Sequence, residues 1–517
     1  MIKRSKIPKC VSEGSRAVHL LLAMALVIGL AATASLPTRV APRLHPLVAQ
    51  LAAEKPEQSV AVIVQKADAS QAAEQLAEHL GGRVTKDLSI INAFVTELPA
   101  WAARELASSS LVRWVSLDAP VASTACTECI DTSRLVNTYI RTIRADSVWN
   151  KSPYLQGQGI GVAIVDSGIN PQEDLISATG ASRIAVSVAF NSGYNASPND
   201  QYGHGNHVAG VIGGNGRRSK GAYIGVAPKV NLINVKVSDD LNHGAGTAST
   251  VVQGLQWILE NKTQYNIRVV NLSLNSAVFE SYHTSPIDAA VEILWFNGIV
   301  VVASAGNRGD GALYPPANDP FVITVGATDE KGTASLSDDV VALFSAYGTT
   351  SDGVKKPDLV APGVNIVGLL GNTNSDMAIA HPDHVVGSAY FRMSGTSASA
   401  PMVAAAAALL LQDEPTLTPD QVKYRLTATA NKAWSKYDSA KAGAGYLNVY
   451  GAVNGATTAS ANTGLQASQL LWTGSQPITW GSVNWNSVNW NSVNWNSVNW
   501  NSVNWNSVNW NSDYWGP

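Results

Sequence analysis

The sequence predicts a large α/β domain with a doubly wound, mostly parallel sheet, preceded by a small α+β domain. Three patterns indicate this. After Gly159, continuous apolar runs alternate with helical segments, as expected for parallel strands that are buried on both faces. Before Gly159, the strand and helix patterns follow the order β-α-β-β-α-β. Further on, the polar turn 394–397 leads directly into an alanine- and leucine-rich helix that suits a large core.

The composition limits the classes of partner. Hydrophobic residues make up 45% of the 517-residue chain, and the formal net charge is −3 at pH 7. These values are ordinary for a globular protein that can bury a full core. The charge pattern does not indicate binding to nucleic acid or to anionic lipid. We expect no nucleic-acid partner, and we expect a monomer.

Residues 1–34 have the pattern of a secretory signal peptide. Basic residues between Lys3 and Arg16 precede a largely apolar run at 17–32, and Ala32-Thr33-Ala34 offers a small-residue cleavage site. An uncleaved membrane anchor is the alternative, although the run is near the lower length limit for a spanning helix. We expect a secreted, extracellular protein, with attachment to the cell surface as a second option.

Cleavage at that site would remove Cys10 and leave Cys126 and Cys129. Export favours a small disulfide between them. A zinc site would need further ligands, and the sequence has no second Cys or His pair at suitable spacing. A redox-active thiol pair has no support from its surroundings.

The small domain is expected within residues 57–123, after a flexible stretch at 36–57. Its strands are expected at 59–66, 83–87, 90–97 and 112–116, and its helices at 69–80 and 99–108. This order corresponds to a ferredoxin-like arrangement. The unit carries no chemistry of its own, but its place before a much larger domain suggests a pro-segment.

The large domain is expected within residues 130–456. Its strands are expected at 160–165, 230–237, 269–274, 299–304 and 321–325, and its helices at 208–213, 248–261, 287–297 and after Ser397. In such folds the sites form at the carboxyl ends of the strands. Catalytic residues should therefore follow the strands.

Four polar residues stand at such positions. Asp166 and Asn307 follow strands, His204 lies at the entrance to a short helix, and Ser397 lies at the turn before the long helix. Taken singly, each has a structural explanation, because Asp and Asn make turns and Ser caps helices. A lone His is more often a hydrogen-bonded core or surface residue.

Taken together, the four residues supply the parts of acyl-transfer catalysis. A serine hydroxyl is a weak nucleophile until an imidazole accepts its proton, and a carboxylate must fix the tautomer of that imidazole. Ser397, His204 and Asp166 supply these groups. The helix dipole favours negative charge beside Ser397, and Asn307 with the backbone N–H of Ser397 can bind the oxyanion. We expect no cofactor for this chemistry.

The chain order Asp, His, Ser and the surrounding motifs resemble the subtilisin-like serine proteases, or subtilases. The resemblance runs from residue 149 to about 456, and residues 255–274 are most similar to the AprX-like subtilases. It is carried by Gly161-Val-Ala-Ile-Val-Asp-Ser-Gly168, Gly203-His-Gly-Asn-His-Val-Ala-Gly210, Val270-Asn-Leu-Ser-Leu274, Val301-Val-Ala-Ser-Ala-Gly-Asn307, Pro357-Asp-Leu-Val-Ala-Pro-Gly363 and Ser394-Gly-Thr-Ser397. The resemblance implies a subtilisin-like fold, with His204 as general base and acid, Ser397 as nucleophile and Asn307 as oxyanion donor. Asp166 would orient His204, and His207 would be structural.

The family binds protein or peptide substrates as an added strand. The resemblance places the two edge segments at Gly244-Ala245-Gly246 and Ser273-Leu274-Asn275. It places the wall of the pocket for the residue before the scissile bond at Ala303-Ser304-Ala305-Gly306.

Three departures from the family pattern stand out. Asn206 stands where the family usually has Thr, and Asn275 stands where Gly is usual. Since Gly permits close approach of the substrate, Asn275 is expected to narrow the pocket. The loop 214–221 is basic and does not resemble the calcium loop of familiar extracellular subtilisins. We infer no calcium there, and other structural calcium sites stay open.

The small domain is similar to the inhibitory pro-domains, of the inhibitor I9 type, that precede secreted subtilases. The resemblance implies that it assists folding of the large domain. It also implies that its C-terminal end fills the substrate groove until it is cut between residues 118 and 130.

Residues 457–517 are expected to form a low-complexity tail. From Asn454 onward Asp513 is the only side chain charged at neutral pH, and Ser-Val-Asn-Trp-Asn repeats from Ser482 to Asn511. Because the period of five is odd, successive tryptophans would alternate faces on a flat strand. An extended or disordered tail is the plain interpretation. The alternatives are a stacking surface for cell wall or polysaccharide, a self-associating ladder and a short β-solenoid.

We predict a secreted serine endopeptidase, made as a self-processing pre-pro-enzyme and acting through an acyl-enzyme on Ser397. The alternative is an adhesive protein in which the fold is a scaffold and the tryptophan-rich tail binds cell wall or polysaccharide. An inactive scaffold should have lost triad residues, and this chain keeps all of them.

Overall fold

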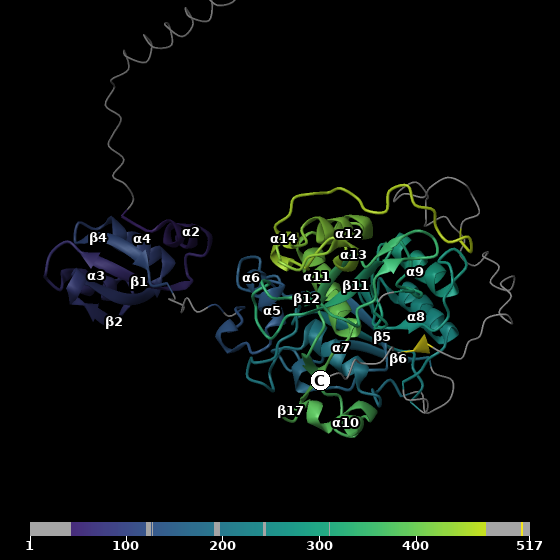
Figure 1. Cartoon of the computed structure of the whole chain (residues 1–517). Helices are drawn as coiled ribbons and strands as arrows, with labels where there is room; N and C mark the ends of the chain where they lie inside the picture. The colour runs from purple at the N-terminus through teal and green to yellow at the C-terminus, as the bar shows by residue number, and fades with distance from the viewer. Residues whose placement is uncertain are drawn as a thin grey trace, which may run out of the picture. The chain divides into compact units, whose positions relative to one another are not determined.

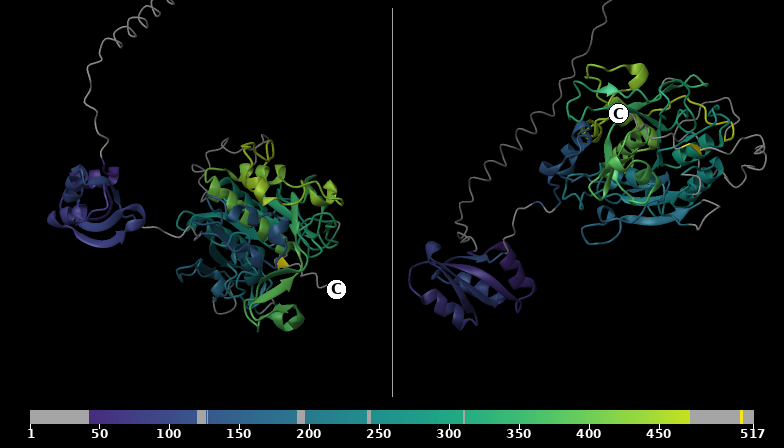
Figure 2. Two further views of the ribbon diagram at one scale, coloured as in Figure 1. Left: turned by 90° about the vertical axis from the view of Figure 1, so that its left-hand side faces the viewer. Right: turned by 60° about the horizontal axis from the view of Figure 1, so that its bottom comes forward.

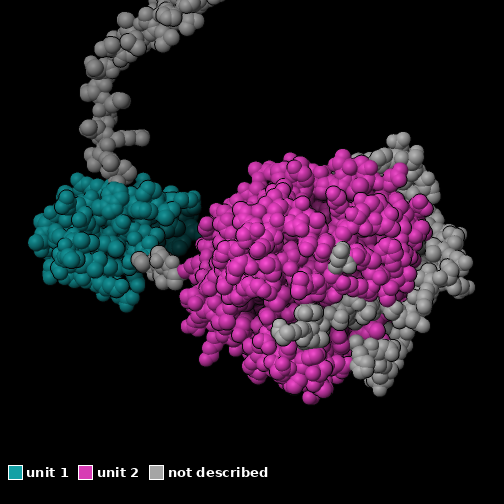
Figure 3. All heavy atoms as spheres, in the orientation of Figure 1, with its two compact units in different colours: residues 1–125 teal, residues 126–517 magenta. Residues whose placement is uncertain are grey.

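The structure is a computed structural model, and it describes residues 43–119, 126, 128–190, 197–240, 244–309, 311–471 and 508–509. The chain divides into two compact units, residues 1–125 and 126–517 (Figure 3). The predicted signal peptide and nearly all of the tryptophan repeats lie outside the described residues. Among the described residues, no helix is long and apolar enough to cross a bilayer.

Unit 1 contains a four-stranded antiparallel sheet. Its strands pair in the order β2-β3-β1-β4. The elements are β1 (Ser59–Lys66), α3 (Ala72–His79), β2 (Arg83–Leu88), β3 (Ala93–Pro99), α4 (Ala100–Ser108) and β4 (Val112–Leu117). They follow the β-α-β-β-α-β order that the sequence pattern indicates. Val62, Val64, Phe94 and Leu106 are buried in a core that belongs to this unit alone.

The stretch before unit 1's sheet is helical, so the prediction of a flexible segment at 36–57 was wrong where the structure describes it. Helix α2 spans Pro46–Glu54. Pro46 occupies the first turn, where its missing N–H costs nothing, and the His45 ring accepts a hydrogen bond from the N–H of Leu47 at 3.3 Å. Val48 and Ala52, four residues apart, are buried on one face of the helix.

Unit 2 is built on a sheet with the order β12-β11-β10-β8-β5-β7-β6, and β15 also pairs with β11. The strands are β5 (Gly161–Asp166), β6 (Ile184–Ala189), β7 (Asn231–Lys236), β8 (Ile267–Leu272), β10 (Val300–Ser304), β11 (Ile323–Asp329), β12 (Val340–Val341) and β15 (Leu359–Pro362). Every pair is parallel except β11 with β12. The predicted doubly wound, mostly parallel sheet is confirmed.

Helices cover this sheet. They include α7 (His204–Gly213), α8 (Ala248–Asn261), α9 (Pro286–Phe296) and α11 (Thr396–Asp413). Helix α7 packs against α11, and α8 packs against α9. All residues of β5 are buried, so both faces of the sheet are covered. Helix α11 contacts β5, β8, β10 and β11 and runs through the middle of unit 2 (Figures 1 and 2).

Shorter elements complete unit 2. They are α5 (Tyr139–Thr142), α6 (Asp146–Trp149), β9 (Asn275–Ser276), β13 (Gly348–Thr349), β14 (Lys355–Lys356), β16 (Ile366–Leu369), α10 (Asp376–Ala380), β17 (Val385–Val386), β18 (Tyr390–Met393), α12 (Pro419–Ala428), α13 (Ser439–Ala442), α14 (Val449–Val453) and β19 (Val508–Asn509).

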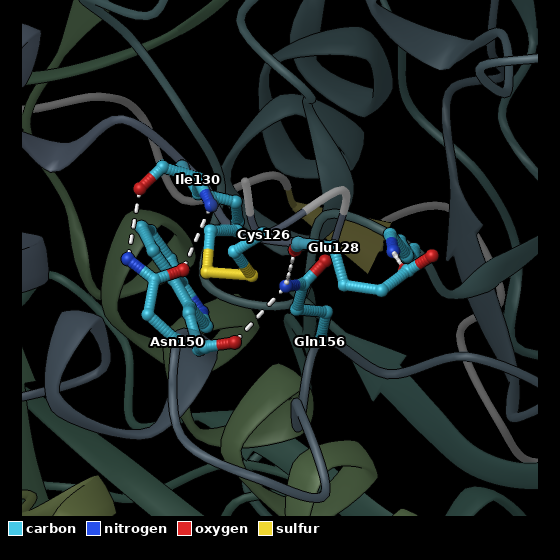
Figure 4. The surroundings of a disulfide bond; sticks show 8 residues. Cys126, Glu128, Ile130, Asn150 and Gln156 are labelled. Atoms are coloured by element: carbon cyan, nitrogen blue, oxygen red, sulfur yellow. Dashed lines mark hydrogen bonds and ion pairs between the residues drawn. A yellow bond between two sulfur atoms is a disulfide. The ribbon is translucent and has the colours of Figure 1, made fainter. Parts of the chain in front are cut away.

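A disulfide joins Cys126 and Cys129 at the start of unit 2 (Figure 4). The segment around it is bonded to the chain that follows α6. The Gln156 side chain donates to the carbonyl of Glu128 at 2.7 Å, and the Asn150 amide makes two hydrogen bonds with the backbone of Ile130. Asn150 follows α6 directly, so these bonds fix the segment to unit 2.

The chain after α14 stays attached to unit 2 as far as residue 471. We call residues 457–471 the strap. The strap includes the buried residues Ala467 and Ser468. The Ser468 N–H donates to Glu292 Oε2 in α9 at 2.7 Å, and Asn462 Nδ2 donates to the Phe321 carbonyl at 3.1 Å. Packed chain therefore continues beyond residue 456.

Gly210 in α7 offers a test of the packing around the sheet. A Cβ at this position would lie 2.4 Å from the backbone nitrogen of Leu369 in β16, where only the backbone itself can move. We expect Gly210→Ala to lower the free energy of unfolding by roughly 1–3 kcal/mol or more. Urea unfolding should show this loss, while Gln253→Ala on the exposed side of α8 should leave stability nearly unchanged.

Candidate active site

Three elements bring Asp166, His204 and Ser397 into one region. Asp166 is the last residue of β5, His204 the first of α7, and Ser397 the second of α11. Helices α7 and α11 pack against each other, and both contact β5. The carboxyl end of a central parallel strand therefore meets the N-termini of two helices, as expected for a doubly wound fold.

Asp166 and His204 are directly hydrogen-bonded. His204 Nδ1 lies 2.7 Å from Asp166 Oδ1, and both side chains are almost fully buried. The Ser167 N–H donates to the same carboxylate oxygen at 2.7 Å. Because a carboxylate only accepts, Nδ1 carries the proton and Nε2 is left as the basic nitrogen.

A second buried carboxylate, Asp200, holds this arrangement, and the sequence analysis missed it. Asp200 accepts hydrogen bonds from the N–H of Gly203 at 2.7 Å and the N–H of Asn206 at 2.8 Å. It also accepts from the Ser167 hydroxyl at 2.8 Å, and that hydroxyl in turn accepts from the N–H of Gly205. An acidic residue four positions before His204, next to a helix start, was the available signal.

Two glycines allow α7 to begin at His204, four residues earlier than predicted. Gly203 precedes the helix with φ of 109°, a conformation that other residues rarely adopt. At Gly205 a Cβ would lie 2.1 Å from the Gly168 carbonyl oxygen, so the helix can approach the end of β5 only with glycine there. The prediction of a helix from residue 208 was wrong, because it took the first apolar residue as the start.

Ser397 lies in the first turn of α11, where backbone N–H groups have no partner within the helix. Its hydroxyl donates to the carbonyl of Ser273 at 3.2 Å. The Ser273 hydroxyl donates in return to the Ser397 carbonyl at 3.0 Å. This pair of bonds joins the turn at Ser397 to the chain that leaves β8.

Asn307 is bonded to the residue that precedes Ser397. Its Oδ1 accepts from both the N–H and the hydroxyl of Thr396, each at 2.9 Å. The Thr396 hydroxyl also accepts from the Gly306 N–H at 3.1 Å. These bonds orient the amide so that Nδ2 lies on the side of Gly395, where a Cβ would approach it to 3.0 Å.

Two of the three predicted peptide-binding segments are joined by a side chain. Asn275 Nδ2 donates to the Ser304 carbonyl at 3.0 Å, which links Ser273-Leu274-Asn275 to Ala303-Ser304-Ala305-Gly306. The third segment, Gly244-Ala245-Gly246, packs against the ring of Tyr202, two residues before His204. The Asp239 N–H donates to the Ala245 carbonyl at 2.7 Å.

His207 lies on the same helix as His204 in a different environment. It is fully buried, and its Nε2 lies 2.9 Å from the Ile366 carbonyl. Burial lowers the pKa of His207 to about 4, so the ring is neutral at neutral pH. Within the described part of the chain, no three His, Cys, Asp or Glu side chains gather as a metal site would require.

The sequence matches a known protein family and is similar to several known proteases. Residues 157–453 match the family described as the subtilase family. The chain is 39% identical over 328 residues to serine protease AprX of Bacillus subtilis, covering 62% of this chain and 72% of that protein. It is 33% identical over 296 residues to subtilisin Savinase of Lederbergia lenta, covering 57% and 91%.

A solved structure supports the fold. The structure of fervidolysin from Fervidobacterium pennivorans, a keratinolytic enzyme related to subtilisin, aligns with a TM-score of 0.50 at 24% identity. The alignment covers 78% of this chain and 62% of that one, so the chain spans less than two thirds of fervidolysin. Since the match to the family extends over more than half of the sequence, the chain belongs to the subtilase family and is a serine endopeptidase that acts on proteins or peptides.

Proposed function

We propose that Asp166, His204 and Ser397 form the catalytic triad and that the enzyme works through an acyl-enzyme on Ser397. The observation that carries this proposal is the 2.7 Å hydrogen bond between buried Asp166 and His204 Nδ1. It fixes the tautomer that a general base needs. The alternative, a scaffold whose tail binds cell wall, has no comparable support, because most of the tail lies outside the described residues.

The reaction begins when His204 Nε2 takes the proton of the Ser397 hydroxyl, which must first leave the Ser273 carbonyl. The hydroxyl oxygen then attacks the scissile carbonyl, and the imidazolium is stabilised by Asp166. Asn307 Nδ2 and the N–H of Ser397 donate to the oxyanion. His204 next protonates the leaving amine, and water repeats the sequence to release the acid.

Substrate would bind as a strand between Gly244-Ala245-Gly246 and Ser273-Leu274-Asn275. Asn275, whose side chain reaches the Ser304 carbonyl, would narrow the pocket walled by Ala303-Ser304-Ala305-Gly306. A smaller residue before the scissile bond is therefore favoured.

We further propose that the protein is secreted and processes itself. Residues 1–34 would be the signal peptide, and unit 1 would be the inhibitory pro-domain. The cut would fall between 118 and 130, in the chain that joins the two units.

The reaction is proposed to need no metal. The basic loop 214–221 is held by protein groups: Asp174 Oδ1 accepts from the Arg218 N–H at 2.7 Å, and Asp174 Oδ2 accepts from the Tyr390 hydroxyl at 2.5 Å. The Arg218 bond ties the loop to Asp174, and this anchor made by the protein supports the proposal that the loop needs no calcium ion.

Ser397→Ala tests the nucleophile. Turnover of casein should fall by several orders of magnitude, because the other groups cannot replace the attacking oxygen. Intact mass and N-terminal sequencing, in a host lacking its own proteases, should show that unit 1 is no longer removed. Ser399 is a buried serine of the same helix, and its hydroxyl donates to the Pro362 carbonyl. As a control, Ser399→Ala should keep both casein hydrolysis and removal of unit 1. Retention of serine-inhibitor-sensitive activity by Ser397→Ala would refute the assignment.

Asn307→Ala should lower kcat about 10²- to 10³-fold with little change in KM, a magnitude known from the oxyanion donor of subtilisin itself. Asn307→Asp separates two roles, because its carboxylate can still accept from Thr396 but has no amide donor. Equal or greater loss in the Asp variant supports the oxyanion role. Recovery of kcat in the Asp variant would mean that Asn307 only holds Thr396.

Asp200 should make stability depend on pH. Burial raises its pKa from 3.8 to about 6, despite hydrogen bonds that favour the carboxylate. The unfolded chain therefore loses this proton first, and the folded protein loses stability as pH rises from about 4 to about 6. In a Ser397→Ala background, urea unfolding should show this decline, by roughly 3 kcal/mol, relative to Asp200→Asn. Parallel pH curves for the two chains would contradict the prediction.

A further inference from the structure

One short piece of the tryptophan-repeat tail pairs with the large domain. Strand β19 (Val508–Asn509) pairs antiparallel with β9 (Asn275–Ser276), with Val508 opposite Ser276 and Asn509 opposite Asn275. The two strands form a sheet of their own, and β19 is the short yellow arrow on unit 2 (Figures 1 and 2). A segment more than 200 residues away in sequence thus meets the edge at Asn275.

This edge continues the segment that holds the Ser397 hydroxyl. The Ser273 carbonyl accepts that hydroxyl at 3.2 Å, and Asn275 is two residues further on, about 7 Å along an extended chain. Asn275 is in turn bonded to Ser304. The tail strand therefore lies on the edge that we assign to the peptide substrate.

The tail strand also runs in the direction that leads toward Ser397. As β19 proceeds from Val508 to Asn509, its partner in β9 changes from Ser276 to Asn275. A peptide that continued this register would place its next two residues opposite Leu274 and Ser273. It would thus run toward the Ser397 hydroxyl in its N-to-C direction.

We propose that the Ser-Val-Asn-Trp-Asn repeat is a tethered peptide ligand of the substrate edge and competes there with substrate. The inference rests on the proposed function, because it takes the Asn275 edge as the substrate site. The recognition is by main-chain pairing of an extended Val-Asn segment. The tail carries this pair at Val483-Asn484, Val488-Asn489, Val493-Asn494, Val498-Asn499, Val503-Asn504 and Val508-Asn509.

Tethering makes a weak pairing effective. A pairing as short as β19 with β9 would bind feebly as a free peptide, but a tether raises the local concentration of the ligand to the millimolar range. The strap fixes the start of the tail, since Ser468 is bonded to Glu292 and the Gln469 N–H donates to the His283 carbonyl at 2.9 Å. Repetition adds further copies of the same ligand to the same tether.

The experiment compares three chains on a chromogenic tetrapeptide: the full chain, a chain ending at Leu471, and a full-length variant with proline at the Val and Asn of every repeat. Proline cannot donate to a ladder, so the variant keeps the tail's length and loses its pairing. We expect the shortened chain and the proline variant to have KM values about two- to ten-fold lower than the full chain, with equal kcat. Equal KM values in all three chains would overturn the inference.

The free peptide Ser-Val-Asn-Trp-Asn-Ser-Val-Asn-Trp-Asn should raise the KM of the shortened chain at millimolar concentration and leave kcat unchanged. A peptide with proline at the Val and Asn positions should have no effect. Slow hydrolysis of the repeat peptide would also support binding at the edge. Absence of any effect of the repeat peptide would contradict the inference.

A separate measurement distinguishes this inference from the proposed function. If no chain hydrolyses the tetrapeptide, the proposed function fails, and binding is then measured directly. The fluorescence anisotropy of a labelled repeat peptide should rise when the shortened Ser397→Ala chain is added. Unlabelled repeat peptide should reverse this rise, and the proline peptide should not. No rise would overturn the inference whatever the activity.

Discussion

The hydrogen bond between Asp166 and His204 is the constraint on which the site depends. A buried carboxylate is costly unless donors surround it, and Asp166 has the N–H of Ser167 and the His204 ring within 2.7 Å. To keep His204 in place, α7 must begin close to β5, which requires Gly203 and Gly205. Asp200 then binds the first turn of α7. The residues of the first turn of α7 are thus constrained by the position of the His204 ring.

The central strands and the candidate triad could be predicted because their signals are local. Strands β5, β7, β8 and β10 are mostly apolar and almost entirely buried, and Asp166 ends one of them while Asn307 follows another. Strand β6 was not predicted, because Ser187 interrupts its apolar residues and its positions are half-buried or exposed rather than fully buried. Helix α2 was missed although its signals are local, since Pro46 stands in its first turn and helix-favouring residues follow it.

Asp200 and the tail strand show where local patterns are insufficient. The role of Asp200 depends on Ser167, which is 33 residues away, and no spacing rule connects them. The sequence analysis considered the tail by itself, and the period of five did not favour a strand with all tryptophans on one face. The pairing of β19 depends on the edge that β9 offers, which the repeat by itself cannot reveal. Asn275, identified as a departure from the family pattern, belongs to that edge.

The disulfide at the start of unit 2 changes what a single cut can do. Peptide-bond cleavage between Cys126 and Cys129 would leave the two pieces joined through sulfur, giving a two-chain protein with unit 1 still attached. Cleavage on the N-terminal side of Cys126 would free unit 1 completely. The position of the cut relative to Cys126 therefore decides whether unit 1 is released or stays attached. If it stays attached, reduction of the disulfide would release it, so the redox state of the surroundings decides how long the two-chain form persists.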